Sequence, residues 1–117
     1  MGQEKLIPVA PSRWGGTGVT FVVEKNSTSI EYDCAVGQIS TQLEVDRHGN
    51  FAVDGSHTRL YPGARRVKLQ PAAQPARYAG KITGKTIRYK VTLKGTGEVV
   101  GEFTAELGEE GRVRSCR

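Results

Sequence analysis

The feature that most constrains the fold of this chain is a two-residue alternation of apolar and polar side chains. It is clearest between Arg77 and Leu93, on both sides of a turn at residues 83–85, where the apolar positions are Tyr78, Gly80, Ile82, Ile87, Tyr89, Val91 and Leu93. Successive side chains of a strand point to opposite faces, so this stretch predicts an antiparallel hairpin with one apolar face and one largely cationic face. A lone hairpin is unstable in water, so its apolar face must meet other strands.

The same alternation recurs along most of the chain. It predicts strands at residues 19–24, 28–34, 39–46, 51–58, 77–82, 87–93, 99–107 and 112–116. The 15 glycines suit the tight turns that would join such strands. We therefore expect an all-β fold, a small antiparallel up-and-down barrel of about eight strands, because closure removes the edge strands; a β-sandwich is the alternative.

A chain of 117 residues has room for one domain. Residues 1–13 contain Pro8 and Pro11 and show no sustained alternation, so we expect an extended N-terminal arm there and the barrel domain over residues 14–117. We expect a monomer. We also expect no transmembrane segment, because no apolar run is long enough to span a bilayer.

The formal net charge of +5 raises the question of a nucleic-acid partner. Proteins that bind single strands place aromatic side chains beside their cations, because the bases stack there. In the predicted hairpin, Tyr78 and Tyr89 lie on the face opposite to Lys81, Arg88 and Lys90. We therefore expect no nucleic-acid partner.

The two cysteines, Cys34 and Cys116, are far apart in the sequence, and neither belongs to a Cys-x-x-Cys pair or lies near metal-spaced histidines. We therefore expect no metal site. In an exported protein they would form one disulfide, whereas in a reducing compartment they would be two buried thiols. Residues 1–5 lack the apolar segment of a signal peptide, and we interpret Met1 as replacing a removed export signal or lipid anchor. We expect the disulfide and an extracytoplasmic location, whether periplasmic, secreted or lipid-anchored.

The alternation fails from Arg59 to Ala76, where Pro62, Pro71 and Pro75 interrupt the chain. So long a connection in a compact domain is often a lid or a binding loop. The alternative is a strap that only covers an open end of the sheet. This segment carries Tyr61 and the cations Arg65, Arg66 and Lys68.

Five polar residues share the predicted inward rows: Tyr32, Thr41, His57, Tyr78 and Tyr89. They are able to select a ligand if the barrel is hollow. The alternative is that the tyrosines close the barrel ends with their hydroxyls in water. Together with the long connection they give the candidate ligand-binding residues Tyr32, His57, Tyr61, Arg65, Arg66, Tyr78 and Tyr89.

The sequence contains few candidate catalytic residues. The chain contains neither Gly-x-Ser-x-Gly nor His-Glu-x-x-His. The neighbouring carboxylates Glu109 and Glu110 lie in a glycine-flanked turn, where we expect them to be solvated. We therefore expect no enzyme, no catalytic residues and no cofactor.

Several short motifs carry a resemblance: Trp14-Gly15-Gly16, Tyr32-Asp33-Cys34-Ala35-x-Gly37-x-Ile39, Gly49-x-Phe51-x-Val53-x-Gly55, Ala76-Arg77-Tyr78-x-Gly80-x-x-x-Gly84 and Arg114-x-Cys116. Together they resemble a family of small, uncharacterised bacterial proteins, many of them exported or lipid-anchored, which implies no particular activity. A first strand marked by Trp and Gly is also similar in outline to the lipocalin and avidin barrels, which implies a calyx for a small molecule. Tyr32-x-Cys34 with a late Cys116 resembles the periplasmic barrel inhibitors of c-type lysozyme.

These observations predict a non-enzymatic extracytoplasmic binding protein whose barrel takes a small amphipathic or anionic ligand. The alternatives are a protein-interaction module, such as an inhibitor of a secreted hydrolase (a lysozyme or a protease), and a structural envelope domain. A ligand barrel needs an empty, partly polar interior. An inhibitor needs a filled core and a projecting loop.

Overall fold

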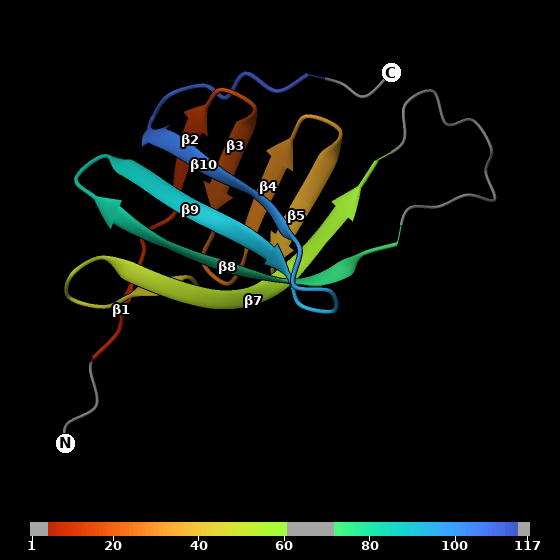
Figure 1. Ribbon diagram of the computed structural model, residues 1–117. Coiled ribbons are helices and arrows are strands. Elements are labelled where there is room, and N and C mark those ends of the chain that lie inside the picture. The colour runs from red at the N-terminus through yellow and green to blue at the C-terminus, as the bar shows by residue number, and fades with distance from the viewer. Residues whose placement is uncertain (1–4, 61–71, 115–117) are drawn as a thin grey trace.

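The computed structural model describes residues 5–60 and 72–114, and all the regular elements in these two ranges are strands. The longer strands are β2 (Ser12–Gly16), β3 (Val19–Val23), β4 (Thr28–Tyr32), β5 (Ala35–Ile39), β7 (Asn50–Arg59), β8 (Gln74–Thr83), β9 (Thr86–Leu93) and β10 (Val99–Leu107). They form a closed antiparallel barrel in the order β10-β2-β3-β4-β5-β7-β8-β9 (Figure 1). The predicted all-β barrel of eight strands is confirmed.

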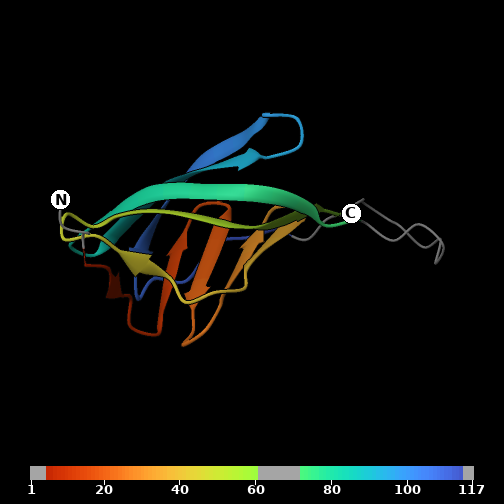
Figure 2. The same cartoon turned by 90° about the horizontal axis from the view of Figure 1, so that it is seen from below.

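The central hairpin is confirmed almost residue by residue. Thr83 pairs with Thr86, so the turn of the hairpin is Gly84 and Lys85. Gly84 has a φ of 59°, a left-handed conformation that favours glycine. The inward side chains of β9 are buried and its outward ones are exposed or half-buried. Figure 2 shows the long strands β7 and β8 curving across the shorter strands β2 to β5.

The barrel is closed by a strand that the alternation did not predict. Trp14, Gly15 and Gly16 belong to β2, which pairs with both β3 and β10. The glycines are needed because the backbone passes very close: a Cβ on Gly15 would collide with the backbone of residues 109–111, and one on Gly16 with the Thr104 carbonyl.

The strand expected at residues 112–116 does not take part in the barrel. Arg112 makes only an isolated parallel bridge with Thr17, and residues 115–117 lie outside the described residues. Residues 109–112 instead cover the outside of β2 and β3, where Gly111 packs against Thr20. The prediction was wrong because β2 already satisfies the edge of β10.

The middle of the chain also differs from expectation. The turn after β4 is at Asp33 and Cys34, with Cys34 at φ 57°, so Cys34 is not a strand residue. The gap left between the strands expected at residues 28–34 and 39–46 is occupied by β5. Gly37 lies inside β5, where the absence of a side chain makes room for the Tyr78 hydroxyl. The strand expected at residues 39–46 is absent; Thr41 is exposed and only the short β6 (Glu44–Val45) forms there.

The N-terminal segment is partly paired. The short strand β1 (Ile7–Pro8) pairs with β6 in a separate two-stranded sheet, and the start of β2 at Ser12 lies within the expected arm. The long connection is also shorter than predicted, because β7 continues to Arg59 and β8 begins at Gln74. Residues 61–71 of this connection lie outside the described residues, and with them Tyr61, Arg65, Arg66 and Lys68.

Candidate functional site

Aromatic rings from five strands fill the interior of the barrel. Phe21 on β3 and Phe103 on β10 both pack against Tyr89 on β9, at ring-centroid distances of 5.1 and 5.6 Å. Tyr32 on β4 is 4.5 Å from Phe103, and Tyr78 on β8 is 6.2 Å from Tyr89. These separations are typical of packed aromatic pairs, so the rings occupy the space that a calyx would leave open.

The hydroxyls of the three tyrosines point to protein partners. The Tyr32 and Tyr89 hydroxyl oxygens are 2.8 Å apart, and the Tyr78 hydroxyl donates to the Ser56 carbonyl at 2.6 Å. None of the three side chains is more than 5% exposed. The interpretation that these tyrosines close the barrel ends with their hydroxyls in water is therefore wrong.

Burial also fixes the protonation of these phenols. It raises the pKa of Tyr78 to about 12. The pKa values of Tyr32 and Tyr89 are raised further, mainly by burial, because an ionised phenolate would lose its hydration there. All three stay neutral at ordinary pH, and their role in the interior is packing and hydrogen bonding.

Glycines on the inward rows make room for the Tyr78 ring. A Cβ on Gly37 of β5 would collide with the Tyr78 hydroxyl, and one on Gly55 of β7 would lie 3.1 Å from the ring edge. These glycines are the reason a large aromatic side chain fits between strands of so narrow a barrel. The glycine content of the chain thus serves the core as well as the turns.

His57 connects the aromatic interior to the surface. It lies on the inward row of β7, is 4% exposed, and its ring centroid is 5.6 Å from that of Tyr32. Its Nδ1 atom is buried and has no hydrogen-bond partner among the described residues. Burial, with a smaller contribution from the Arg59 charge, lowers the pKa of the imidazole, so His57 is neutral at pH 7.

One end of the barrel beside His57 carries a cavity of about 240 Å³, which we call the mouth pocket. Its lining comes from β7, the start of β8 and the residues just before it, β9, and the turn that joins β9 to β10. It consists of His57, Arg59, Ala72, Gln74, Leu93, Thr96 and Glu98. Leu93 supplies an apolar wall and is 6% exposed. Arg59 and Glu98 approach one another at 4.0 Å, with both side chains more than half exposed. The pocket therefore offers a cation, an anion, an apolar surface and a buried imidazole.

The structure separates the predicted site residues into three groups. Tyr32, Tyr78 and Tyr89 belong to the packed interior, and only His57 lines the mouth pocket. Tyr61, Arg65 and Arg66 lie outside the described residues.

Four polar residues of the mouth pocket were missed: Arg59, Gln74, Thr96 and Glu98. The two-residue period that places His57 on an inward row also places Arg59 on it, and that signal was available in the sequence. In the sequence, Gln74 lies in the long connection expected from Arg59 to Ala76. Thr96 and Glu98 lie between the strands expected at residues 87–93 and 99–107. No local pattern joins these three to His57.

A second cavity, of about 250 Å³, lies beside the β4–β5 turn and is lined by residues that include Cys34, Val113 and Arg114. The Arg114 backbone N–H donates to the Asp33 carboxylate at 2.6 Å, so the C-terminal segment reaches this turn. Cys34 is not a free cysteine. Cys116 lies outside the described residues, and the pairing of Cys34 with Cys116 stays a prediction.

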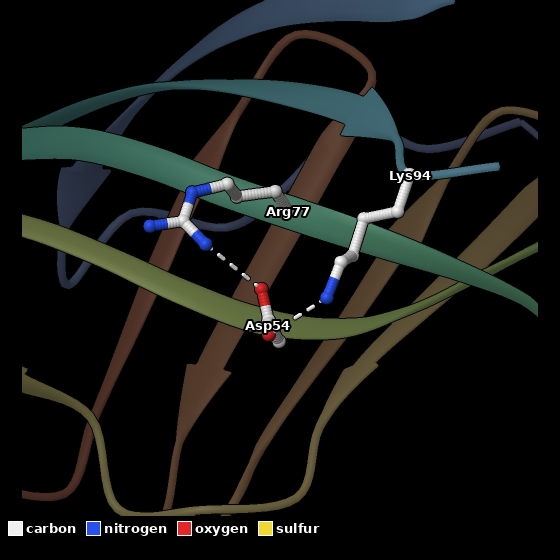
Figure 3. A network of polar contacts seen from close by, with 3 residues as sticks. All are labelled: Asp54, Arg77 and Lys94. Atoms are coloured by element: carbon white, nitrogen blue, oxygen red, sulfur yellow. Dashed lines mark hydrogen bonds and ion pairs between the residues drawn. The ribbon is translucent and has the colours of Figure 1, made fainter. Parts of the chain in front are cut away.

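On the outer face of the barrel, one carboxylate joins three strands (Figure 3). Asp54 on β7 accepts hydrogen bonds from Arg77 on β8 at 3.0 Å and from Lys94, just after β9, at 2.9 Å. The Lys94 hydrogen bond is the main reason that the pKa of Asp54 is lowered. All three side chains are about half exposed, so the network contributes little to stability. None of the three residues lines the mouth pocket.

Comparisons of the chain with protein-family models, with curated proteins and with solved structures gave no significant match. Over residues 5–60 and 72–114, no helix is long and apolar enough to cross a membrane. The same residues hold no cluster of three or more His, Cys, Asp or Glu side chains that could bind a metal ion.

Proposed function

We propose that the protein is a non-enzymatic extracytoplasmic binding protein that takes a small amphipathic or anionic ligand in the mouth pocket. The observation that carries this proposal is the imidazole of His57, which lines the pocket and whose buried Nδ1 atom has no partner among the described residues. Burying an unsatisfied polar atom costs roughly 1–3 kcal/mol. A ligand that forms a hydrogen bond with this imidazole would recover that cost.

The filled interior is what directs the ligand to the mouth pocket and away from the barrel axis. Tyr32, Tyr89 and Phe103 are in ring contact across the axis, and a ligand there would have to displace them. Barrels of eight strands are just wide enough to be filled by side chains. The resemblance to lipocalins and avidin therefore concerns only the outline of the fold. The ligand proposed here binds at the mouth of the barrel, whereas a calyx holds its ligand inside.

The lining of the mouth pocket supports the ligand class. Arg59 offers a guanidinium to a carboxylate or phosphate, and its contact with Glu98 is long enough for a ligand to compete with it. Leu93 and Ala72 offer apolar surface to the remainder of the ligand. A short acid with an apolar tail matches both parts.

Thermal unfolding with a panel of small acids tests the proposal. Acetate, hexanoate and succinate are each added to the wild-type protein, to Arg59→Gln and to Arg13→Gln, a matched loss of one exposed cation on β2. A ligand at a hundred times its dissociation constant stabilises the folded state by about 2.7 kcal/mol. We expect hexanoate to raise the melting temperature of the wild type and of Arg13→Gln but not of Arg59→Gln.

Two results would reject this ligand site. One is the absence of stabilisation by any of the three acids. The other is an equal response of Arg59→Gln and Arg13→Gln, which would mean that the acids act on the net charge of the protein.

A protein-interaction module is the second candidate, and the filled aromatic interior is the observation that favours it. An inhibitor of a secreted hydrolase needs a rigid scaffold and no ligand cavity. Adding the purified protein to a c-type lysozyme and to a serine protease tests this alternative directly. Inhibition of either enzyme at micromolar concentration would favour it over the ligand-binding proposal.

The extracytoplasmic part of the proposal depends on the predicted disulfide. Its support is that Cys34 is not free and that the Arg114 N–H is bonded to the neighbouring Asp33, two residues before Cys116. Thiol titration of the unfolded, unreduced protein should find no reactive thiol. Two reactive thiols would remove the case for export.

A further inference from the structure

The outer face of the β8–β9 hairpin carries a group of cations that we call the hairpin patch: Lys81, Lys85, Arg88 and Lys90. All four side chains are exposed. Lys81 and Arg88 lie directly opposite one another on the two strands. On the flanking strands, the residues directly opposite these two cations are uncharged: Asn50 on β7 pairs with Lys81, and Thr104 on β10 pairs with Arg88.

This arrangement is unfavourable for the isolated protein. Like charges directly opposite on neighbouring strands destabilise a sheet. None of the four patch residues makes an ion pair with another described residue, although Glu102 on β10 lies opposite Lys90 and Glu106 lies diagonally from Arg88. At the other end of the same face, Arg77 and Lys94 both form ion pairs with Asp54 (Figure 3). A cationic patch whose side chains form no ion pairs is an electrostatic complement for an anionic partner.

The patch is also distinct from the mouth pocket. Gln74 and Leu93, which line that pocket, are the outer ends of the hairpin strands, whereas Lys85 lies in the turn at the opposite end. An anion on the hairpin patch would therefore not occupy the mouth pocket.

The shape and chemistry of the face select the kind of anion. The aromatic residues of β8 and β9, Tyr78 and Tyr89, are both buried, so no ring on these strands is available for a base to stack on. The outer face of a closed barrel is convex, which lets a flexible chain follow it but limits the contact with a flat bilayer. Outward residues along one strand recur at about 7 Å, a spacing that an extended, regularly charged polymer can match.

We propose that the hairpin patch binds a linear polyanion that carries no bases, such as an acidic glycan or a polyphosphate. Lys81 and Arg88 form the centre of the site, and Lys85 and Lys90 extend it along the hairpin. The inference goes beyond the small-ligand proposal and is independent of it, because no residue is shared.

Binding of three fluorescently labelled probes, followed at increasing salt concentration, tests the proposal. The probes are heparin as a linear sulfated glycan, long-chain polyphosphate, and an oligothymidylate of similar charge. The proteins are the wild type, Lys81→Gln/Arg88→Gln and the matched control Arg13→Gln/Lys25→Gln, which loses the same charge from exposed residues elsewhere. Anionic phospholipid vesicles are the fourth binding partner.

We expect heparin or polyphosphate to bind the wild type and the control with the same dependence on salt. In Lys81→Gln/Arg88→Gln the slope of log affinity against log salt should fall by about 2, since each lost cation contact accounts for about 1. Whichever of the two polymers binds more tightly identifies the source of the anion.

The proposal is overturned if neither polymer binds the wild type. It is also overturned if the patch variant and the control weaken equally, which would reflect net charge alone. Tighter binding of the oligothymidylate or of the vesicles than of both polymers would contradict the stated chemistry. The thermal stability of the patch variant, whose substitutions are exposed, separates loss of binding from loss of fold.

Discussion

Gly37 shows how a single missing side chain determines the packing of the interior. It lies on an inward row of β5, where the Tyr78 hydroxyl takes the place of a side chain and bonds to the Ser56 carbonyl. Glycine normally weakens a strand because it adds backbone freedom and no packing. Here the loss is offset by the burial of a whole phenol ring.

Gly37→Ala should therefore destabilise the protein. The added Cβ would collide with Tyr78, and overpacking of this kind costs about 1–3 kcal/mol. Gly95→Ala is the matched control, because no atom lies within 4 Å of a Cβ built there, and a surface change of this type stays within about 0.5 kcal/mol. Urea unfolding measures both. Equal stability of the two variants would mean that Tyr78 does not occupy this position in solution.

His57 gives the protein a dependence on pH. The buried imidazole has a lowered pKa in the folded protein, against an ordinary value of about 6.5 in the unfolded chain. Below pH 6.5 the unfolded chain therefore binds a proton that the folded protein does not. Stability should be fully present above that pH and decline as the pH falls toward the folded pKa.

Unfolding free energies measured between pH 7 and 5 check this expectation. His57→Leu should flatten the decline, because it removes the group whose pKa burial lowers. Asp46 and Asp54 do not interfere, because their pKa values are held below 3.8 by hydrogen bonds, chiefly from the Asn50 N–H and from Lys94. An unchanged slope in His57→Leu would count against a buried neutral imidazole.

Among the elements, the β8–β9 hairpin is the one in which surface charge most clearly lowers stability, because Lys81 lies opposite Arg88. Lys81→Thr removes the like charge opposite Arg88 and should stabilise the protein by about 0.5 kcal/mol. Arg77→Thr, on the same strand and face, removes an ion pair with Asp54 and should give no gain. The difference should shrink at high salt, which screens exposed charges. Destabilisation by Lys81→Thr would show that the patch is not a strained arrangement.

The same hairpin shows how far local pattern predicts an element. Its alternation is uninterrupted, both faces have a clear character and Gly84 marks the turn, so strand pairing and burial followed from the sequence. In β2 and β5 glycines interrupt the alternation by which strands are recognised in the sequence. These glycines make room for residues that are distant in the sequence: the backbone of residues 109–111 at Gly15 and the Tyr78 side chain at Gly37. The pattern of a single sequence does not reveal such long-range contacts.

At the scale of the whole molecule, barrel closure brings together what the sequence keeps apart. The count of strands was predicted, but the closing strand was not, because β2 and β10 pair across nearly the full length of the chain. The mouth pocket has the same origin: His57 and Arg59 come from β7, whereas Glu98 comes from the turn before β10. Inward alternation identified His57, and only the closed barrel supplies its neighbours.

The central claim is that the interior is packed and that a small ligand binds at the mouth pocket. Methyl and imidazole NMR during a titration with hexanoate tests both parts in one measurement. We expect the signals of His57 and Leu93 to shift, with Ile30 and Ile87, buried in the core, unchanged. Shifts at Ile30 and Ile87 with His57 unmoved would place the ligand inside the barrel and contradict this account.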